Sequence, residues 1–361
     1  MTYTERLREA LFEKDNPVQA DGALITSAPN CRYLSGFPSS SRTMLVTKEQ
    51  SYFLTDFRYA EAARKTIKGC QVVEYKNSVT AIKELLRRHE IHTLLLEYDN
   101  LSYGESVKYK KLCEEVGAEA VLDRTLDSIL MELRSVKQPE EIAKIRAAQA
   151  ITDASFDYIL PKIRPGVTER EIALEIEFFM KRQGAEALAF DLIVVSGENG
   201  SMCHGVPGEK QIRNGDFITM DIGAVVDGYH SDMTRTVALH HVAPEQRDVY
   251  ETVLKAQRAA VEAVAPGKPC RQIDWVARSI IDEKYPGTFG HSTGHSVGVE
   301  IHEMPVFAPS CETLTKPGMV ITVEPGIYLT GKFGVRIEDM VLVTEDGREK
   351  LTHSPKDLII L

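Results

Sequence analysis

The stretch Gly215-Asp-Phe-Ile-Thr-Met-Asp221-Ile-Gly223 recurs further along the chain as Gly318-Met-Val-Ile-Thr-Val-Glu324-Pro-Gly326. The shared pattern is Gly-x-x-Ile-Thr-x-acid-x-Gly. In both copies a short apolar run bounded by glycine is typical of a buried strand, so each acid is expected near a strand end, where a site can open. An acid beside an apolar run is costly unless it is paired or binds a metal. The repeat therefore predicts two related strands that each carry a functional acid.

Other elements repeat in the same order around these two stretches. A Pro-Gly pair is followed by Arg and Ile at the same spacing in both copies, with Pro165, Gly166, Arg170 and Ile172 in the first and Pro266, Gly267, Arg271 and Ile273 in the second. A His-x-x-Pro segment also occurs twice, at residues 204–207 and 302–305. A second acid follows in each copy, Asp232 in the first and Glu338 in the second. Several matched elements in one order favour two αβ halves related by a pseudo-twofold axis. Asp221, Asp232, Glu324 and Glu338 would then converge at that axis.

Four converging carboxylates need a source of positive charge. In a low-dielectric cleft they repel one another and shift toward protonation. A pair of divalent cations would cancel the four negative charges. An oxygen-rich ligand set with one imidazole favours Mn(II), and permits Co(II) or Zn(II). The acids therefore predict a centre of two divalent metal ions.

The histidines divide into candidate site residues and structural residues. His291 and His295 lie in Phe289-Gly-His-Ser-Thr-Gly-His-Ser-Val-Gly298, where glycines allow close approach to a ligand. His295 is interpreted as the metal ligand, and His204, His291 and His302 as groups around a substrate. A lone histidine is more often a hydrogen-bonded structural residue, which is the expectation for His89, His92, His230, His240, His241 and His353.

The N-terminal part of the chain predicts a separate, smaller domain. Strands are expected at residues 23–26, 43–46, 52–54, 71–74 and 93–96, and helices at residues 58–67, 79–89 and 106–116. This alternation indicates an α/β layer domain. Pro139 reads as the first residue of a helix, and the polar segment around Ser135–Lys137 as a hinge or linker. The expected domains are residues 1–130 and 131–361.

Composition limits the class of protein. The chain has 361 residues and a formal net charge of −10, without a run of basic residues, which argues against a nucleic-acid partner. It has no apolar stretch long enough to span a membrane, and its first residues lack the apolar region of a signal peptide. The six cysteines are scattered, as expected of reduced thiols. These features together predict a cytoplasmic location.

At these residues the chain resembles the pita-bread metallopeptidases, which include Xaa-Pro dipeptidase (prolidase), aminopeptidase P and methionine aminopeptidase. The resemblance covers the whole chain and lies in the segments Ser231-Asp-Met-Thr-Arg-Thr236, Gly294-His295, Val323-Glu-Pro-Gly-Ile-Tyr328 and Val335-Arg-Ile-Glu-Asp339. Leu54-Thr-Asp-Phe-Arg-Tyr59 is similar to the creatinase-like domain of the proline-specific branch, which methionine aminopeptidases lack. Creatinase shares the fold without metals, whereas all five ligand positions are filled here. Ser296 departs from the glycine that usually follows the ligand histidine.

The resemblance implies an α+β chain whose C-terminal pita-bread domain cleaves Xaa-Pro bonds with two metal ions. Asp221 would bind one ion, His295 and Glu324 the other, and Asp232 and Glu338 both. A hydroxide between the ions would attack the carbonyl carbon before proline, and Glu324 would carry a proton to the leaving nitrogen.

The resemblance also implies roles for the surrounding residues. His291 and His302 would hydrogen-bond the substrate or the developing oxyanion, and His204 would line the proline pocket. Arg336 would bind a substrate carboxylate or orient the bridging ligands. The expected activity is that of an Xaa-Pro dipeptidase acting as a homodimer, with aminopeptidase P as the alternative.

The sequence also allows two other functional classes. Gly290-His-Ser292-Thr-Gly294 and Gly294-His-Ser296-Val-Gly298 both match the Gly-x-Ser-x-Gly elbow of serine esterases, with Asp339 or Asp346 and His353 as imaginable partners. The elbow needs an apolar strand before it, and residues 282–288 are polar. A non-enzymatic binding protein on the same fold is the third class, against which the complete ligand set argues.

Overall fold

The computed structural model describes residues 1–12 and 20–361, which divide into two compact units, Met1–Arg134 and Ser135–Leu361. The expected boundary after residue 130 falls inside helix α6 (Thr125–Ser135), which runs unbroken to the end of the first unit. The division between the units, after Arg134, falls inside the polar segment 133–137 that was interpreted as a hinge or linker, although Ser135 belongs to α6 and Lys137 is only 3% exposed. The prediction that the N-terminus is not a signal peptide rests on residues 1–16, of which residues 13–16 lie outside the described residues.

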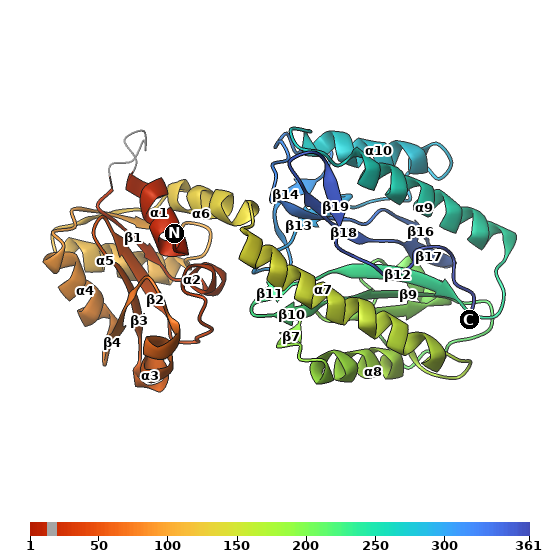
Figure 1. Cartoon of the computed structure of the whole chain (residues 1–361), viewed down its shortest axis with the longest axis horizontal. Helices are drawn as coiled ribbons and strands as arrows, with labels where there is room; N and C mark the ends of the chain where they lie inside the picture. Colours follow the sequence, from red (N-terminus) through yellow and green to blue (C-terminus); the bar gives the residue numbers. More distant parts are fainter. Residues whose placement is uncertain (13–19) are drawn as a thin grey trace. The chain divides into compact units, whose positions relative to one another are not determined.

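The first unit is built on one mixed sheet, with strand order β4-β3-β2-β1-β5-β6 (Figure 1). Its strands are β1 (Gly22–Ile25), β2 (Thr43–Thr47), β3 (Ser51–Thr55), β4 (Gln71–Glu74), β5 (Thr93–Leu96) and β6 (Glu119–Val121). Its other helices are α1 (Tyr3–Phe12), α2 (Ala28–Ser35), α3 (Phe57–Thr66), α4 (Ser78–Arg88) and α5 (Tyr103–Glu114). The strands and helices expected from the sequence are present, while α1, α2, α6 and β6 were not expected.

The second unit has two pairs of helices on opposite sides of its strands, α7 with α8 and α9 with α10 (Figure 1). These helices are α7 (Pro139–Ile159), α8 (Glu169–Arg182), α9 (Pro244–Ala263) and α10 (Cys270–Asp282). Pro139 is the first residue of α7, as predicted, because a helix start tolerates a missing N–H. The strands are β7 (Ala187–Leu188), β8 (Ile193–Ser196), β9 (Phe217–Ile222), β10 (Ala224–Val226), β11 (Tyr229–His230), β12 (Met233–Ala238), β13 (Gly294–Ser296), β14 (Glu303–Phe307), β15 (Val320–Val323), β16 (Gly326–Leu329), β17 (Phe333–Arg336), β18 (Asp339–Val343) and β19 (Arg348–Lys350).

The sequence repeat is also a repeat of backbone structure. In one sheet β9 lies between β8 and β12, and in the other β15 lies between β13 and β18, with antiparallel pairing throughout. Gly215 and Gly318, the first residues of the repeated pattern, have φ of 87° and 89°. This left-handed conformation favours glycine, so the same turn leads into both central strands. The structure confirms the α+β class and the pseudo-twofold arrangement.

Each half of the second unit has its own apolar core. Side chains of α7, α8, β9 and β12 form one cluster, which includes Phe156, Ile176 and Ile218. Side chains of α9, α10, β15 and β18 form the main part of the other, which includes Tyr250 and Ile321. The central strands are therefore held rigidly from both sides, and their ends present the repeated acids at fixed positions.

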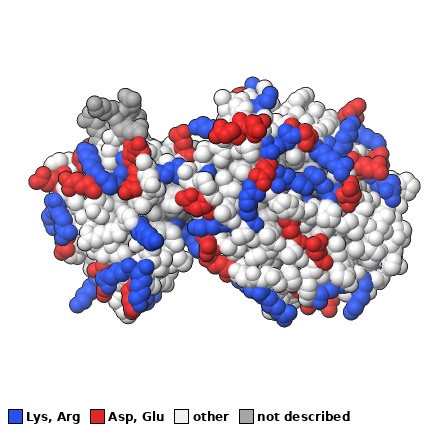
Figure 2. Space-filling model, viewed as in Figure 1, with Lys and Arg blue, Asp and Glu red and all other residues white. Residues whose placement is uncertain are grey.

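The surface carries mixed charge. On the face that Figure 2 shows, acidic and basic side chains are interspersed. Among residues 1–12 and 20–361, the helices are all too short or too polar to cross a membrane.

Candidate metal centre

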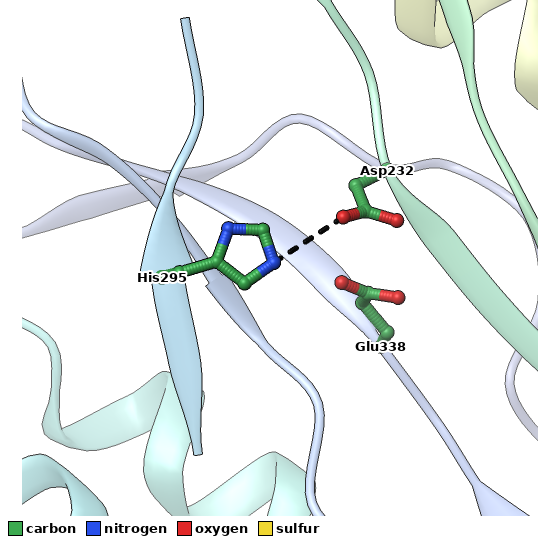
Figure 3. A group of neighbouring side chains, drawn as sticks. All are labelled: Asp232, His295 and Glu338. Atoms are coloured by element: carbon green, nitrogen blue, oxygen red, sulfur yellow. Dashed lines mark ion pairs between the residues drawn. The ribbon is translucent and has the colours of Figure 1, made fainter. Parts of the chain in front are cut away.

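The two halves bring their acids and one histidine together. Asp221 lies near the end of β9, and Asp232 in the turn between β11 (Tyr229–His230) and β12. Glu324 directly follows β15, and Glu338 lies between β17 and β18. Asp232, His295 and Glu338 point toward one another, and one potential ligand atom from each lies within 4.8 Å of the others (Figure 3). The predicted convergence of distant residues is therefore present.

The ring of His295 presents one nitrogen to the acids. Nε2 lies 3.4 Å from Asp232 Oδ2 and 3.3 Å from Glu324 Oε1. Nδ1 lies 3.1 Å from the carbonyl oxygen of Ser296, which can only accept a hydrogen bond. Nδ1 therefore donates to this carbonyl, which leaves Nε2 as the nitrogen that could bind a metal ion.

The acids are poorly neutralised by the protein alone. Asp232 and Glu338 are 4% and 1% exposed, and burial together with the neighbouring carboxylates raises the pKa of both side chains. Asp221 Oδ1 and Glu338 Oε1 are buried without a hydrogen-bond partner among the described residues. Buried oxygens of this kind are normally satisfied. Because the donors are carboxylate oxygens and one imidazole, the arrangement fits divalent cations.

Arg336 contacts Asp221 directly and Glu338 through Thr234. Its Nη2 donates to Asp221 Oδ2 at 2.7 Å, and its Nε donates to Thr234 Oγ1 at 2.9 Å. Thr234 in turn donates to Glu338 Oε2 at 2.8 Å. The guanidinium is 4% exposed and is engaged with groups of the protein itself. In this structure Arg336 orients carboxylates of the site.

Tyr328 connects Arg336 to His291. Arg336 Nη1 donates to the Tyr328 hydroxyl at 2.9 Å, and this hydroxyl lies 2.9 Å from His291 Nε2. His291 Nδ1 lies 2.8 Å from the Ser292 carbonyl, so Nδ1 carries the proton and Nε2 accepts from the tyrosine. Burial lowers the pKa of His291 and raises the pKa of Tyr328 to about 12. Both ring nitrogens of His291 are therefore engaged, and the imidazole is neutral at pH 7.

A cavity of about 710 Å³ opens in front of the cluster. Its polar lining includes Asp221, Asp232, His295, Glu324, Arg336, His204, His291 and His302, so all the predicted site residues except Glu338 border it. His302 is exposed to this cavity, with its ring centroid 4.5 Å from that of His295. Phe190, Leu192 and Ile301 contribute an apolar wall. The cavity can hold a small molecule with one apolar end and one end at the acids.

Comparison with known proteins places this geometry in a family. Residues 143–345 match metallopeptidase family M24, and residues 4–136 match the Creatinase/Prolidase N-terminal domain. The chain belongs to metallopeptidase family M24. It is an enzyme of a metal-dependent hydrolase class, and the expected pita-bread fold with a creatinase-like N-terminal domain is confirmed.

Proteins similar to this M24 peptidase include enzymes of both proline-specific kinds. The chain is 38% identical over 361 residues to an Xaa-Pro dipeptidase of Pyrococcus furiosus, covering 98% of this chain and 99% of that protein. The structure of an Xaa-Pro dipeptidase from Bacillus anthracis superposes with a TM-score of 0.93 at 40% identity, covering 99% of each chain. An X-Pro aminopeptidase from Thermotoga maritima superposes with a TM-score of 0.89 at 32% identity, also over 99% of each.

The alternative prediction of a serine esterase is wrong, because the chain belongs to a metallopeptidase family. Ser296 is fully buried, and its hydroxyl donates to the Val320 carbonyl at 3.0 Å. Asp339, one imagined partner, pairs with Arg235 at 2.8 Å and with Lys356. The family membership likewise sets aside the non-enzymatic binding protein.

Thr234, Thr322 and Tyr328 also belong to the site, although they were not predicted from the sequence as site residues. Thr322 Oγ1 donates to Glu324 Oε1 and accepts from the backbone N–H of His295, both at 3.0 Å. A signal was present, since Thr322 is the threonine of the repeated pattern and the other two lie inside the motif segments. Their hydrogen bonds, however, depend on strands that meet only in the folded chain.

Replacing Tyr328 by phenylalanine should lower the activity of the enzyme without removing any predicted metal ligand. The change removes the hydroxyl that joins Arg336 to His291, so kcat/KM should fall roughly tenfold, as for other groups that orient a metal site. Peptidase kinetics check this result. Tyr103→Phe, at a residue that is 86% exposed, is the matched control and should leave kcat/KM unchanged. Equal kinetics for both variants would show that the hydroxyl does not orient the site.

Proposed function

We propose that this M24 peptidase is an Xaa-Pro dipeptidase that holds two divalent metal ions, Mn(II) in the first place and Co(II) or Zn(II) as substitutes. The observation that supports this most is the convergence of Asp232, His295 and Glu338, with buried carboxylate oxygens that have no partner among the described residues. Asp221, Asp232, His295, Glu324 and Glu338 would hold these ions. Bound ions supply a Lewis acid and a strong nucleophile at neutral pH.

The protein groups would position the peptide and move its protons. Glu324, with Oε1 held by Thr322, would transfer a proton to the leaving proline nitrogen. His302 is open to the cavity and would hydrogen-bond the substrate carbonyl, whereas His291, whose two ring nitrogens are engaged, would border the substrate. His204 is exposed at the cavity and would border the proline ring. Arg336 borders the cavity and would act on the substrate indirectly, by orienting Asp221 and Tyr328.

Specificity for proline follows from the shape of the substrate. The Xaa-Pro bond is a tertiary amide without an N–H, and the ring fixes φ. A site that does not depend on gripping that N–H, and that offers an apolar wall such as Phe190 and Leu192, suits this ring. The relatives named Xaa-Pro dipeptidase support the dipeptide as substrate, and the Thermotoga maritima match keeps aminopeptidase P as the second candidate.

We also propose a cytoplasmic homodimer. All six cysteines are free, which supports a reducing compartment. The dimer is proposed from the resemblance to the proline-specific branch. Sedimentation of the purified chain would test it, and a monomer at assay concentration with full activity would contradict it.

Cleavage of two short peptides tests the function. With Mn(II) present, the enzyme should hydrolyse Ala-Pro, and a chelator should abolish this activity while a serine-directed phosphonate leaves it intact. Ala-Ala is the control peptide and should remain uncut, because it lacks the ring. Cleavage of Ala-Pro-Ala alone would identify aminopeptidase P instead.

A further inference from the structure

Lys137 places a buried ammonium group beside the metal centre. Its Nζ donates to Ser296 Oγ at 2.8 Å and to the Ser135 carbonyl at 3.4 Å, and lies 3.2 Å from Glu303 Oε2. Two of these contacts are hydrogen bonds, and the contact with Glu303 is an ion pair. The backbone N–H of Lys137 donates to the Gly318 carbonyl at 2.9 Å. The residue is therefore fixed at both its backbone and its side-chain end, with 1% of its side chain exposed.

Ser296 connects Lys137 to His295, the candidate metal ligand. Its hydroxyl accepts from Lys137 and donates to the Val320 carbonyl on the neighbouring strand β15. Its own carbonyl accepts from Nδ1 of His295 at 3.1 Å. The carbonyl partner of a metal-binding histidine sets the orientation of the ring and leaves the other nitrogen for the metal. Fixing Ser296 thus fixes the direction of His295 Nε2.

Glu303 connects Lys137 to the strand segment that begins next to His302. Glu303 directly follows His302 and is the register partner of Ser296 across β13 and β14. The register of these strands shifts between His295 and Ser296, an irregularity that redirects side chains. Glu303 is 9% exposed, and a Cβ added at Gly298 would come within 2.5 Å of its Oε2. The carboxylate therefore occupies a tight site, where Lys137 provides its positive partner.

We propose that Lys137 is a positioning residue for the metal site. By holding Ser296 and Glu303, it fixes the two residues that follow His295 and His302, at the point where strand pairing is irregular. The serine at position 296 is part of this arrangement, because its hydroxyl oxygen accepts a hydrogen bond from Lys137 Nζ at 2.8 Å. This inference rests on the proposed role of His295 as a metal ligand.

The test compares Mn(II) binding to the full-length apoprotein and its variants, with free Mn(II) measured by electron paramagnetic resonance. Lys137→Met keeps the length of the side chain and removes the ammonium, so the dissociation constant should rise about tenfold. Lys255→Met, at an exposed residue of α9, is the matched control and should bind as the wild type does. Thermal unfolding of each variant is followed by circular dichroism, because a purely structural role would lower Tm without changing the affinity of the folded protein.

Each outcome decides the proposal. Weaker Mn(II) binding by folded Lys137→Met supports it, and affinity equal to wild type overturns it. If Lys137→Met does not fold, Ser296→Ala takes its place, since it removes only the hydroxyl that accepts from Lys137. Weaker binding by that variant then supports the proposal, and unchanged binding overturns it. If the wild type binds no Mn(II), the proposed metal site fails and this inference fails with it.

Discussion

Glu338→Gln should lower kcat/KM for Ala-Pro by roughly a thousandfold and sharply reduce the amount of Mn(II) bound. The amide keeps the size of the side chain but removes a carboxylate oxygen and its charge from the group that Glu338 forms with Asp232 and His295. Metal ions contribute several kcal/mol to stabilising transition-state charge, and about 4 kcal/mol corresponds to three powers of ten in rate. Steady-state kinetics and metal content of the dialysed protein measure both effects.

An exposed acid nearby provides the control for this substitution. Glu345 lies in the turn after β18 and is exposed, so Glu345→Gln should retain wild-type kinetics and metal content. Nearly normal activity in Glu338→Gln would mean that this carboxylate is not a metal ligand, and the five-residue ligand set would have to be revised.

Removal of metal should lower the thermal stability of the wild type and reverse the order of stability between wild type and Glu338→Gln. A ligand present at 100 times its Kd adds about 2.7 kcal/mol, which corresponds to roughly 5–10 °C in Tm for a domain of this size. Without metal, Asp232 and Glu338 are left buried beside one another. In Glu338→Gln the amide can donate to Asp232, so the metal-free variant should melt above the metal-free wild type.

Calorimetry with and without chelator checks this reversal. With Mn(II) the wild type should be the more stable protein, and with chelator the variant. A wild type whose Tm does not respond to Mn(II) would contradict the prediction. So would a variant that is less stable than wild type under both conditions, because that result would give Glu338 a structural role independent of metal.

The parts of the fold that the sequence predicted are those encoded locally and repeated. Gly215 and Gly318 share a left-handed backbone, and the apolar residues after them need burial, so the pattern alone indicates two equivalent strands. The short helix α2 was missed although Ser27 caps it and Gly36 ends it, since no long apolar period accompanies these signals. Strand β6 was missed for a similar reason, being only three residues long.

The contacts that support the site could not be predicted in this way. Lys137 sits in a polar local sequence, and its burial depends on Ser296 and Glu303, which reach it only in the folded chain. Tyr328 gave no local sign that its hydroxyl would engage His291, so the sequence assigned that imidazole to the substrate alone. Ligand residues are visible because of their chemical type, whereas the residues that orient them are defined by tertiary contacts.

The division of the metal-site residues between the two halves has a consequence for the stability of the enzyme. One half supplies Asp221 and Asp232, and the other supplies His295, Glu324 and Glu338. Ions bound among these residues would add a cross-link between halves that otherwise meet through contacts such as that of Phe217 with Tyr250. Loading with metal should therefore slow proteolysis at the seam between the halves more than within either one, and the enzyme's resistance to degradation would follow the supply of metal in its surroundings.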